Sequence, residues 1–291
     1  MFRSIVVPLD GSAFAEQALP VAFELARCSG AAVTLIRVHQ PPAMAVSRSN
    51  VWDAEVRRRE TQYLTDTSVR SSDLLGAVPD VALVEGRPSD AICRWALDRD
   101  APLIVMSSHG LTGFSRYWIG SVTDSVIRDA RMPVLMVRSR SAEEPPPAVA
   151  IHKILVPLDG SRVAEAILPH ALSIAKATGA TLELYRVIGP AQMPEVPSGL
   201  EEDAASALVR ESELDLRGAA ARAGAAALEV PVEVKACIAD APATSISEHA
   251  RARHCELVAL TTAASGLARL VGSVADKVIR HGPAMVLLMR P

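Results

Sequence analysis

The sequence is poor in residue types that mark several classes of protein. Only four of its 291 residues are cysteine, and no two have the C-x-x-C spacing, so neither a zinc site nor a disulfide framework is indicated and the thiols are expected to be reduced. Lysine is equally scarce, and the four lysines all lie in the second half of the chain. With a net charge of −3 and no dense run of Lys and Arg, the chain is not expected to bind nucleic acid.

Long apolar runs are also missing, although 49% of the residues are hydrophobic. No run approaches the ~20 residues that a membrane-spanning helix needs. The opening stretch MFRSIVVPLD is interrupted by Pro8 and closed by Asp10, which makes it too short for a signal peptide. We therefore expect a soluble, cytoplasmic protein with a sizeable core and no membrane contact.

Several segments of the sequence occur twice. Residues 3–12 read RSIVVPLDGS, and residues 152–161 read HKILVPLDGS. Two further segments of the first half return in the second half, namely Gly30–Val38 as Gly179–Val187 and Gly120–Arg128 as Gly272–Arg280. A unit of about 145 residues that occurs twice predicts a duplicated domain of ordinary size.

The repeat also sets the expected domain boundaries. An N-terminal domain is predicted at residues 1–140 and a C-terminal domain at residues 151–291. Residues 141–150 between them include three consecutive prolines, Pro145–Pro147. A proline-rich linker of this kind is expected to be semi-rigid.

Short β-branched runs alternate with helical patterns in each copy. In the first copy, strands are predicted at residues 5–9, 33–38, 81–84, 103–106 and 134–137, and helices at residues 12–30, 52–75, 89–99 and 118–128. In the second copy, strands are predicted near residues 154–158, 182–187, 232–236, 257–260 and 285–289. This alternation predicts the α/β class: two repeated doubly wound domains, each with a five-stranded parallel sheet that carries helices on both faces.

Two of the predicted strands end in residues that could contact a ligand, because doubly wound sheets bind ligands at the carboxyl ends of their strands. Asp10 follows the first strand, with Asp159 at the same place in the repeat, and its carboxylate can accept hydrogen bonds from a ribose hydroxyl or a base amine. An Asp before a helix also helps the helix to start, and the sequence leaves both interpretations open. Val38 closes the second strand, where its backbone could contact a base edge or form an ordinary strand end.

The fourth predicted strand runs into the stretch MSSHGLTGFSRYWIGS at residues 106–121. Gly110, Gly113 and Gly120 allow the backbone to turn tightly and to approach a ligand. The sequence GSVT from Gly120 stands at a predicted helix start, where free N–H groups and the helix dipole favour an anion. The alternative is that the serine only caps the helix. The glycines and hydroxyls favour phosphate, although the stretch lacks the lysine of a Walker loop and no G-x-G-x-x-G follows the first strand.

Patterns for catalysis or metal binding are sparse. His109 stands beside Ser107 and Ser108, but adjacency in sequence does not give the geometry of a catalytic triad, and no G-x-S-x-G motif is present. We interpret His109 as a loop residue with a structural or peripheral binding role. The other histidines show no metal-binding spacing.

Together these motifs resemble the universal stress protein family, in its tandem form with two fused domains. The marks are V-P-L-D-G-S at the start of each copy, G-x-P at Gly86–Pro88, and the block that begins at Gly120. ATP-binding members of the family carry G-x-x-G, nine residues, and then G-[ST]. Here Gly110, the nine residues after it and Gly120 match, whereas Ser107 replaces the first glycine. The resemblance covers nearly the whole chain and implies a Rossmann-like, adenine nucleotide alpha hydrolase-like fold.

The resemblance further implies a site for ATP, with Mg²⁺ as an optional companion of the nucleotide. It implies contacts with ribose and adenine at one end of the site, with the glycine-rich loop in the middle, and with the phosphates at the other end. The residues that match these roles are, in that order, Asp10 and Val38; Met106, Ser107 and Gly110; and Gly120, Ser121, Val122 and Thr123.

The second copy departs further from the family pattern. Ala264 stands where Gly110 was, and the following segment is two residues shorter. We expect this half to bind nucleotide weakly or not at all; its weaker candidate residues are Asp159, Val187, Gly272 and Ser273. Because single domains of the family pair through their last strands, the resemblance implies an intramolecular pseudo-dimer of the two halves, with a homodimer of the chain as a further option.

The expected function is that of a stress-response protein that binds ATP or another adenine nucleotide in its N-terminal domain and acts as a regulator or sensor. It is not expected to be an enzyme, since no loop lysine or recognisable base supports more than slow ATP hydrolysis. The alternative is an interaction scaffold whose two pockets have decayed. An adenylyl-transfer enzyme would carry S-G-G-x-D-S or an H-I-G-H-like signature near the first strand, and Val7–Ser12 has neither.

Overall fold

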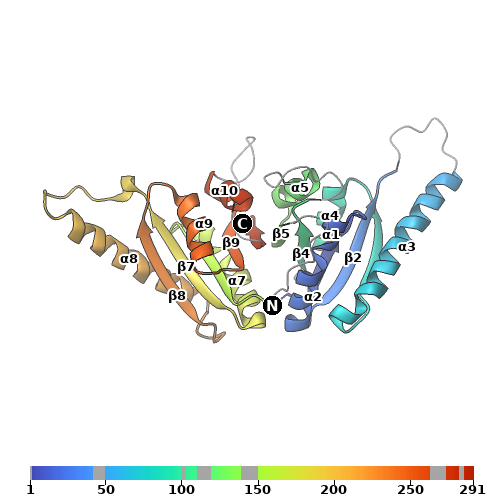
Figure 1. Cartoon of the computed structure of the whole chain (residues 1–291), viewed down its shortest axis with the longest axis horizontal. Coiled ribbons are helices and arrows are strands. Elements are labelled where there is room, and N and C mark those ends of the chain that lie inside the picture. Colours follow the sequence, from blue (N-terminus) through green and yellow to red (C-terminus); the bar gives the residue numbers. More distant parts are fainter. Residues whose placement is uncertain are drawn as a thin grey trace. The chain divides into compact units, whose positions relative to one another are not determined.

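The structure is a computed structural model that describes residues 2–41, 50–99, 102–109, 119–138, 150–262, 273–281 and 285–291. The chain divides into two compact units, Met1–Val149 and Ala150–Pro291. Most of the linker expected at residues 141–150 lies outside the described residues. Each unit is an α/β domain in which strands and helices alternate (Figure 1).

The first unit contains a parallel five-stranded sheet in the order β3-β2-β1-β4-β5. Its strands are β1 (Ser4–Pro8), β2 (Ala32–His39), β3 (Asp80–Glu85), β4 (Pro102–Ser107) and β5 (Val134–Val137). Its helices are α1 (Ala13–Glu16), α2 (Leu19–Ser29), α3 (Asn50–Leu75), α4 (Pro88–Leu97) and α5 (Ser121–Asp129). The predicted doubly wound parallel sheet is therefore confirmed in this unit.

The strand order of the first sheet reverses next to β1. Ile5 of β1 is in register with Val33 of β2 on one side and with Leu103 of β4 on the other. From β1 the chain first moves outward through β2 and β3, and then returns to add β4 and β5 on the opposite side. Right-handed crossovers consequently place α2 and α3 on one face and α4 and α5 on the other, and they leave a crevice at the carboxyl ends of β1 and β4.

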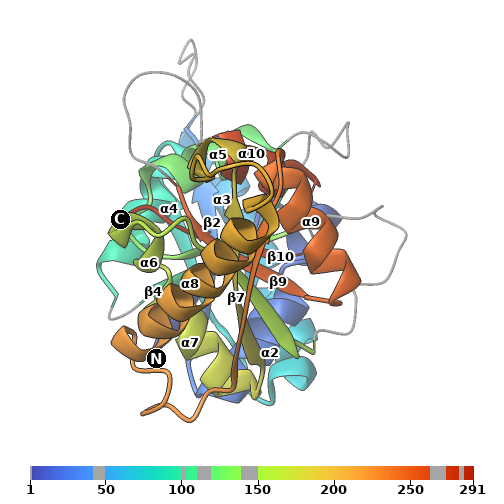
Figure 2. The same cartoon turned by 90° about the vertical axis from the view of Figure 1, so that its left-hand side faces the viewer.

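The second unit repeats this plan with the strand order β8-β7-β6-β9-β10, again parallel. Its strands are β6 (Lys153–Pro157), β7 (Thr181–Ile188), β8 (Val232–Ile238), β9 (Leu257–Thr261) and β10 (Met285–Met289). Its helices are α6 (Arg162–Glu165), α7 (Leu168–Thr178), the 3-10 turn η1 (Pro190–Gln192), α8 (Glu201–Arg222), α9 (Pro242–Ala252) and α10 (Ser273–His281). Figure 2 shows α8 and α9 on opposite sides of β7 and β8.

The central strands read as continuous apolar runs because helices cover them on both faces. Ile5, Val6 and Val7 of β1 are at most 1% exposed, and Ile154 and Leu155 of β6 are fully buried. Both strands stop at a proline, Pro8 or Pro157 in the described bounds. The sequence beyond each strand is then free to form the loop that starts the next helix.

The helix predicted from Ser12 to Gly30 is wrong as a single element, because the structure divides it into α1 and α2. Pro20 has no N–H to donate to the carbonyl of Glu16, and its ring would clash with that carbonyl in a continuous helix. Pro20 instead lies in the first turn of α2, where a missing N–H costs nothing. The second unit breaks in the same way at Pro169, in the first turn of α7.

The helix predicted at residues 118–128 begins later than expected. In the structure α5 starts at Ser121, and Gly120 occupies its N-cap position with φ −58° and ψ 145°, which is outside the helical region. Trp118 lies outside the described residues. The glycine thus precedes the helix, as an anion-binding helix start requires.

Among the helices in the described part of the chain, none combines the length and apolar character that a membrane crossing needs. The four cysteines are free thiols; Cys93 and Cys255 are buried, whereas Cys28 and Cys237 are half-buried.

Candidate functional site

A cavity of about 470 Å³, here called the first cavity, opens at the carboxyl ends of β1, β2 and β4. Residues of α1, α3, α4 and α5 complete its wall. It therefore lies where the strand order reverses, which is the ligand-binding position of a doubly wound sheet. Its volume falls within the usual range of small-molecule sites.

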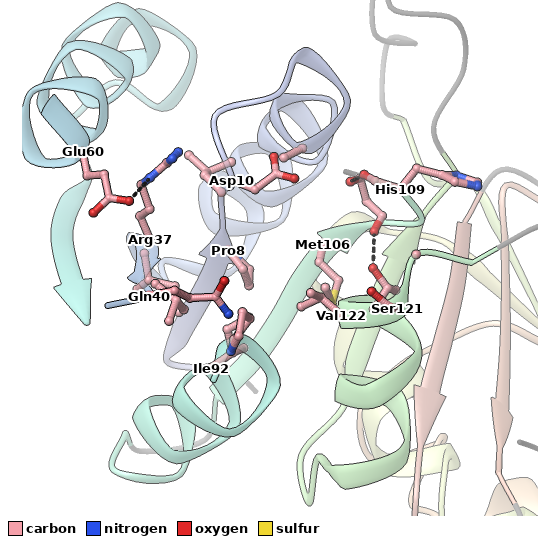
Figure 3. A pocket seen from close by; sticks show the side chains of 18 residues that line it. Pro8, Asp10, Arg37, Gln40, Glu60, Ile92, Met106, His109, Ser121 and Val122 are labelled. Atoms are coloured by element: carbon pink, nitrogen blue, oxygen red, sulfur yellow. Dashed lines mark hydrogen bonds and ion pairs between the residues drawn. The ribbon is translucent and has the colours of Figure 1, made fainter. Parts of the chain in front are cut away.

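Eight of the nine residues predicted for the nucleotide site line the first cavity. They are Asp10, Val38, Met106, Ser107, Gly120, Ser121, Val122 and Thr123. The ninth, Gly110, lies outside the described residues. In Figure 3, Asp10 and Arg37 lie on one side of the cavity, and Met106, Ser121 and Val122 lie across from them. Groups expected at the ribose and groups expected at the phosphates thus face a common space.

Asp10 serves the helix start and the cavity together. Its Oδ1 accepts hydrogen bonds from the Ser12 backbone N–H at 2.9 Å and from the Ser12 hydroxyl at 2.6 Å. The Ser12 Oγ in turn accepts from the Ala15 N–H at 3.1 Å and caps α1. The helix-start interpretation is therefore confirmed, and the ribose contact stays a prediction for a carboxylate that also lines the cavity.

Arg37 supports the loop that carries Asp10. Gly11 has φ +88°, a conformation that favours glycine, and a Cβ at this position would lie 2.6 Å from Arg37 Nη1. The guanidinium also lies 5.3 Å from the centre of the Tyr63 ring, and its Nε lies 3.4 Å from Glu60 Oε1. The arginine consequently fills the space beneath the loop while lining the cavity itself.

Several residues of the cavity wall were not predicted from the sequence, among them Arg37, Gln40, Glu60 and Ile92. The repeat carried a signal for Arg37, because Arg186 stands at the same place in the second copy. No comparable signal existed for Glu60, since its contribution depends on which side of α3 faces the sheet.

The N-terminus of α5 presents backbone N–H groups to the first cavity. Gly120 makes no side-chain cap, and the first intrahelical bond runs from the Asp124 N–H to the Gly120 carbonyl at 2.9 Å. The N–H groups of Ser121, Val122 and Thr123 therefore precede the first intrahelical bond, and all three residues line the cavity. Capping by Ser121, the alternative considered from the sequence, is wrong. Such a helix start is suited to bind an anion.

Two hydroxyls at this end hold the loop rather than offer protons to a ligand. The Thr123 Oγ1 donates to the Ser107 carbonyl at 3.0 Å, and the Ser107 hydroxyl donates to the His109 carbonyl. The Gly120 N–H donates to the Ser108 carbonyl at 2.8 Å. These bonds tie the end of β4 to the start of α5, so that the anion-binding capacity of this end comes from backbone groups.

His109 lines the first cavity beside β4. Its Nδ1 lies 2.9 Å from the Ser108 hydroxyl. The structural or peripheral binding role expected from the sequence stays a prediction.

A buried histidine next to the cavity positions one of its wall residues. His39 is 1% exposed, with Nδ1 2.7 Å from Glu60 Oε2 and Nε2 3.0 Å from Asp53 Oδ1. The Arg57 guanidinium donates a hydrogen bond to Asp53 and lowers the pKa of that carboxyl, which keeps it ionised. His39 thereby joins the end of β2 to α3 and fixes Glu60 at the wall.

The second unit has a smaller cavity, here called the second cavity, of about 360 Å³ at the matching strand ends. Asp159 and Val187, two of its four weaker candidates, line it. Gly272 lies outside the described residues, and of Ser273 only the backbone is described, at the start of α10. The duplicated sequence thus builds a cavity in each unit.

Tyr185 lines the second cavity, and its titration reports on that wall. Burial raises the pKa of Tyr185 to about 12, above the value of about 10 for a free tyrosine. Between these values the folded state binds more protons than the unfolded state, so stability is fully present below pH ~10 and falls as the pH rises toward ~12. An ultraviolet difference titration of the native chain against Tyr185→Phe should show this phenolate appearing near pH 12. Ionisation near pH 10 would contradict the buried, hydrogen-bonded placement.

Within the described residues, no group of three or more His, Cys, Asp and Glu side chains is arranged to hold a metal ion.

Comparison with known proteins gives the same family for both units. The model of the universal stress protein family matches residues 1–138 and again residues 150–290. A universal stress protein of Thermus aquaticus is 33% identical over 141 residues, which is 47% of this chain and 100% of the relative. One from Methanocaldococcus jannaschii is 30% identical over 146 residues, or 49% of this chain and 86% of the relative.

A solved structure extends the likeness to both units at the level of the fold. A universal stress protein from Archaeoglobus fulgidus has a TM-score of 0.72 and 18% sequence identity, with 99% of this chain and 98% of that chain covered. The family match spans nearly the whole chain, and it occurs once in each repeat. The chain therefore belongs to the universal stress protein family, as a tandem of two such domains.

Proposed function

We propose that the first unit binds ATP, accompanied by Mg²⁺, and that the chain acts as a nucleotide-dependent regulator or sensor in a stress response. The observation that carries the proposal is the arrangement of the first cavity. The start of α5, where three N–H groups precede the first intrahelical bond, and the Asp10 carboxylate line the same cavity of about 470 Å³.

Each part of a nucleotide has a chemical partner in this cavity. The N–H groups at the start of α5, with the helix dipole, suit the phosphates. The Asp10 carboxylate suits ribose hydroxyls, which are hydrogen-bond donors. The backbone of Val38, at the end of β2, suits the edge of the adenine base, and Ile92 of α4 adds an apolar surface.

We propose binding without rapid turnover. Fast phosphoryl transfer needs a residue that orients the attacking water and cations that neutralise the developing charge. Among the described residues of the cavity wall, Arg37 is the cation, and it is held by Glu60 and placed on the Asp10 side. Hydrolysis is therefore expected to be slow, and the nucleotide serves as a signal.

An interaction scaffold without nucleotide is the second candidate, and Ser107 favours it. The family's loop pattern has glycine at this position, and here a buried serine donates its hydroxyl to the His109 carbonyl. The side chain of Ser107 leaves less room for phosphates to approach the backbone than a glycine would. The scaffold would act through its surface, and its thermal stability would not respond to ATP.

We also propose that the two units pair as an intramolecular pseudo-dimer through their last strands, β5 and β10. This follows the pairing of single domains in the family, and a homodimer of the chain is the alternative use of the same strands. A fragment of residues 1–146 is then expected to self-associate or to lose stability, as measured by analytical ultracentrifugation and melting. A stable monomeric fragment would contradict the pairing.

That the protein acts in the cytoplasm also stays a prediction.

Replacing Asp10 tests the ATP proposal at one atom. Asp10→Asn keeps the size of the side chain but removes the negative charge, so that the ribose contact weakens and the dissociation constant for Mg-ATP is expected to rise about tenfold. Calorimetric titration of the full chain measures it. Asp98→Asn, the same change at the end of α4 and outside the cavity, is the control. If both variants bind Mg-ATP with the same dissociation constant, Asp10 does not contact the nucleotide.

A further inference from the structure

The wall of the second cavity is largely apolar, and part of it is exposed to water. Ile246 of α9 and Leu260 of β9 line the cavity and are buried. Val163 and Val274 also line it, but they are 50% and 37% exposed. Exposed apolar side chains gain free energy when an apolar group covers them, and a cavity of about 360 Å³ has room for a small ligand that does so.

The arginine that lines the first cavity turns away from the second. Arg186 of β7 stands at the place of Arg37 in the repeat, but it does not belong to the described wall of the second cavity. Its guanidinium instead donates to Asp215 Oδ2 at 3.1 Å and to the carbonyl oxygen of Asp159 at 3.2 Å. The described wall therefore contains the Asp159 carboxylate but no Arg, Lys or His side chain.

Asp159 can offer one carboxylate oxygen to a ligand. Its Oδ1 accepts the Ser161 N–H at 2.8 Å, and its Oδ2 has no hydrogen-bond partner within the described part of the chain. The residue is exposed, so water screens its charge until a ligand covers it. A carboxylate beside an apolar surface is suited to bind an ammonium group that carries an apolar substituent.

Tyr185 gives the same cavity a fixed aromatic surface. Its hydroxyl lies 2.9 Å from Ser245 Oγ, and its ring stacks on His249 with 4.1 Å between the ring centroids. Its carbonyl accepts the Leu158 N–H at 2.9 Å, so Asp159 comes directly after the residue that bonds to this tyrosine. Aromatic rings suit the apolar body of an organic cation and also attract its charge.

The start of α10 borders the cavity as well, and it favours the opposite charge. Val274 and Ala275 line the cavity in the first turn of this helix, where backbone N–H groups carry partial positive charge. A helix dipole is equivalent to roughly half an elementary charge at its end, whereas the carboxylate of Asp159 carries a full charge. The carboxylate is therefore expected to decide which ligand charge the cavity prefers.

We propose that the second cavity binds a small organic amine. Its ammonium group pairs with Asp159, and its apolar body lies against Tyr185 and Ile246 and covers the exposed side chains of Val163 and Val274. This proposal does not depend on ATP binding by the first unit. The tandem chain then has two sites of different chemistry, and the second unit is a receptor of its own.

Three ligands with the same phenethyl body and different charges test the preference in the full chain. They are phenethylamine, the neutral phenethyl alcohol and the anionic hydrocinnamate. By calorimetric titration, the dissociation constant of phenethylamine is expected to be at least about tenfold lower than that of hydrocinnamate, with the alcohol between them. Hydrocinnamate that binds as tightly as phenethylamine or more tightly would assign the cavity to an anion and overturn the proposal. Absence of binding heat for phenethylamine would overturn it too.

Matched variants show which cavity holds the amine. Asp159→Asn is expected to raise the dissociation constant of phenethylamine about tenfold and to change that of phenethyl alcohol by less than about twofold. Asp10→Asn, the same change in the first cavity, is expected to leave the affinity for phenethylamine unaltered. If Asp10→Asn weakens the binding of phenethylamine and Asp159→Asn does not, the amine occupies the first cavity and the proposal is wrong.

Cavity-filling variants give a second, independent result. Ala164 and Ala15 line the second and the first cavity at matching places of the repeat. Ala164→Phe is expected to abolish phenethylamine binding, and Ala15→Phe is expected to preserve it. Circular dichroism checks that each variant is folded, and the two Asp→Asn variants decide the matter if a filled chain does not fold. Phenethylamine binding that survives in folded Ala164→Phe would contradict the proposal.

Discussion

Gly120→Val is expected to abolish measurable ATP binding by the first unit, with a loss of affinity of about 100-fold or more. Gly120 lines the first cavity directly before the free N–H groups of α5. A β-branched side chain at this position stands between those groups and a phosphate, and the helix start loses close contact with the anion. Calorimetric titration with Mg-ATP measures the loss.

Gly189→Val is the matched control for this substitution. Gly189 is also the N-cap of a short helical element, η1, with φ −79° and ψ 156°, and its nearest atom to an added Cβ is 4.0 Å away. It does not belong to the described wall of either cavity. ATP binding that persists in Gly120→Val, or that falls equally in both variants, would show that the nucleotide does not use the start of α5.

Glu183→Ala is expected to give the largest loss of stability, about 2–3 kcal/mol of local unfolding free energy in the second unit. Glu183 is buried, and its carboxylate pairs with His249, Arg253 and Lys153. Removing it takes away the buried carboxylate that His249 contacts, and it leaves Arg253 and Lys153 with their bonds to Glu233 alone. The partners keep some solvent contact, which holds the loss below that of a fully buried pair.

Hydrogen exchange followed by mass spectrometry measures this effect where it should occur, in peptides from β7 and α9. Glu183→Gln keeps the shape and part of the hydrogen bonding, so its effect should be smaller. Glu24→Ala removes a carboxylate from an exposed pair with Arg27 in the first unit and should leave exchange in β7 unchanged. If hydrogen exchange in Glu183→Ala is the same as in the unaltered chain, the ion pairs of Glu183 do not stabilise β7 and α9.

Local sequence signals predicted the strands well because burial on both faces demands uninterrupted apolar runs. The strands predicted at residues 134–137 and 285–289 have these bounds in the structure, and the others differ by one or two residues at their ends. The prediction of one helix from Ser12 was wrong at Pro20. The ring and the missing N–H of this proline end the helix although the apolar pattern continues through it. Proline in a periodic segment was the overlooked signal.

The cavity was predictable to the extent that it is built from strand ends. Asp10 and Val38 directly follow or close predicted strands, and the topology alone brings such positions together. Glu60 comes from the middle of α3, and its place at the wall depends on side-chain pairs with His39 and Arg37 that no spacing rule encodes. The same holds for Glu183, which stands in a buried strand where the first copy has Thr34.

The most direct test of the proposed function is thermal melting of the unaltered chain with and without excess Mg-ATP, combined with calorimetric titration. We expect one ATP to bind per chain, in the first unit. At a ligand concentration 100 times the dissociation constant, the native state of that unit should be stabilised by about 2.7 kcal/mol. If neither a melting shift nor binding heat appears, the first cavity does not hold ATP, and the scaffold becomes the better description of the protein.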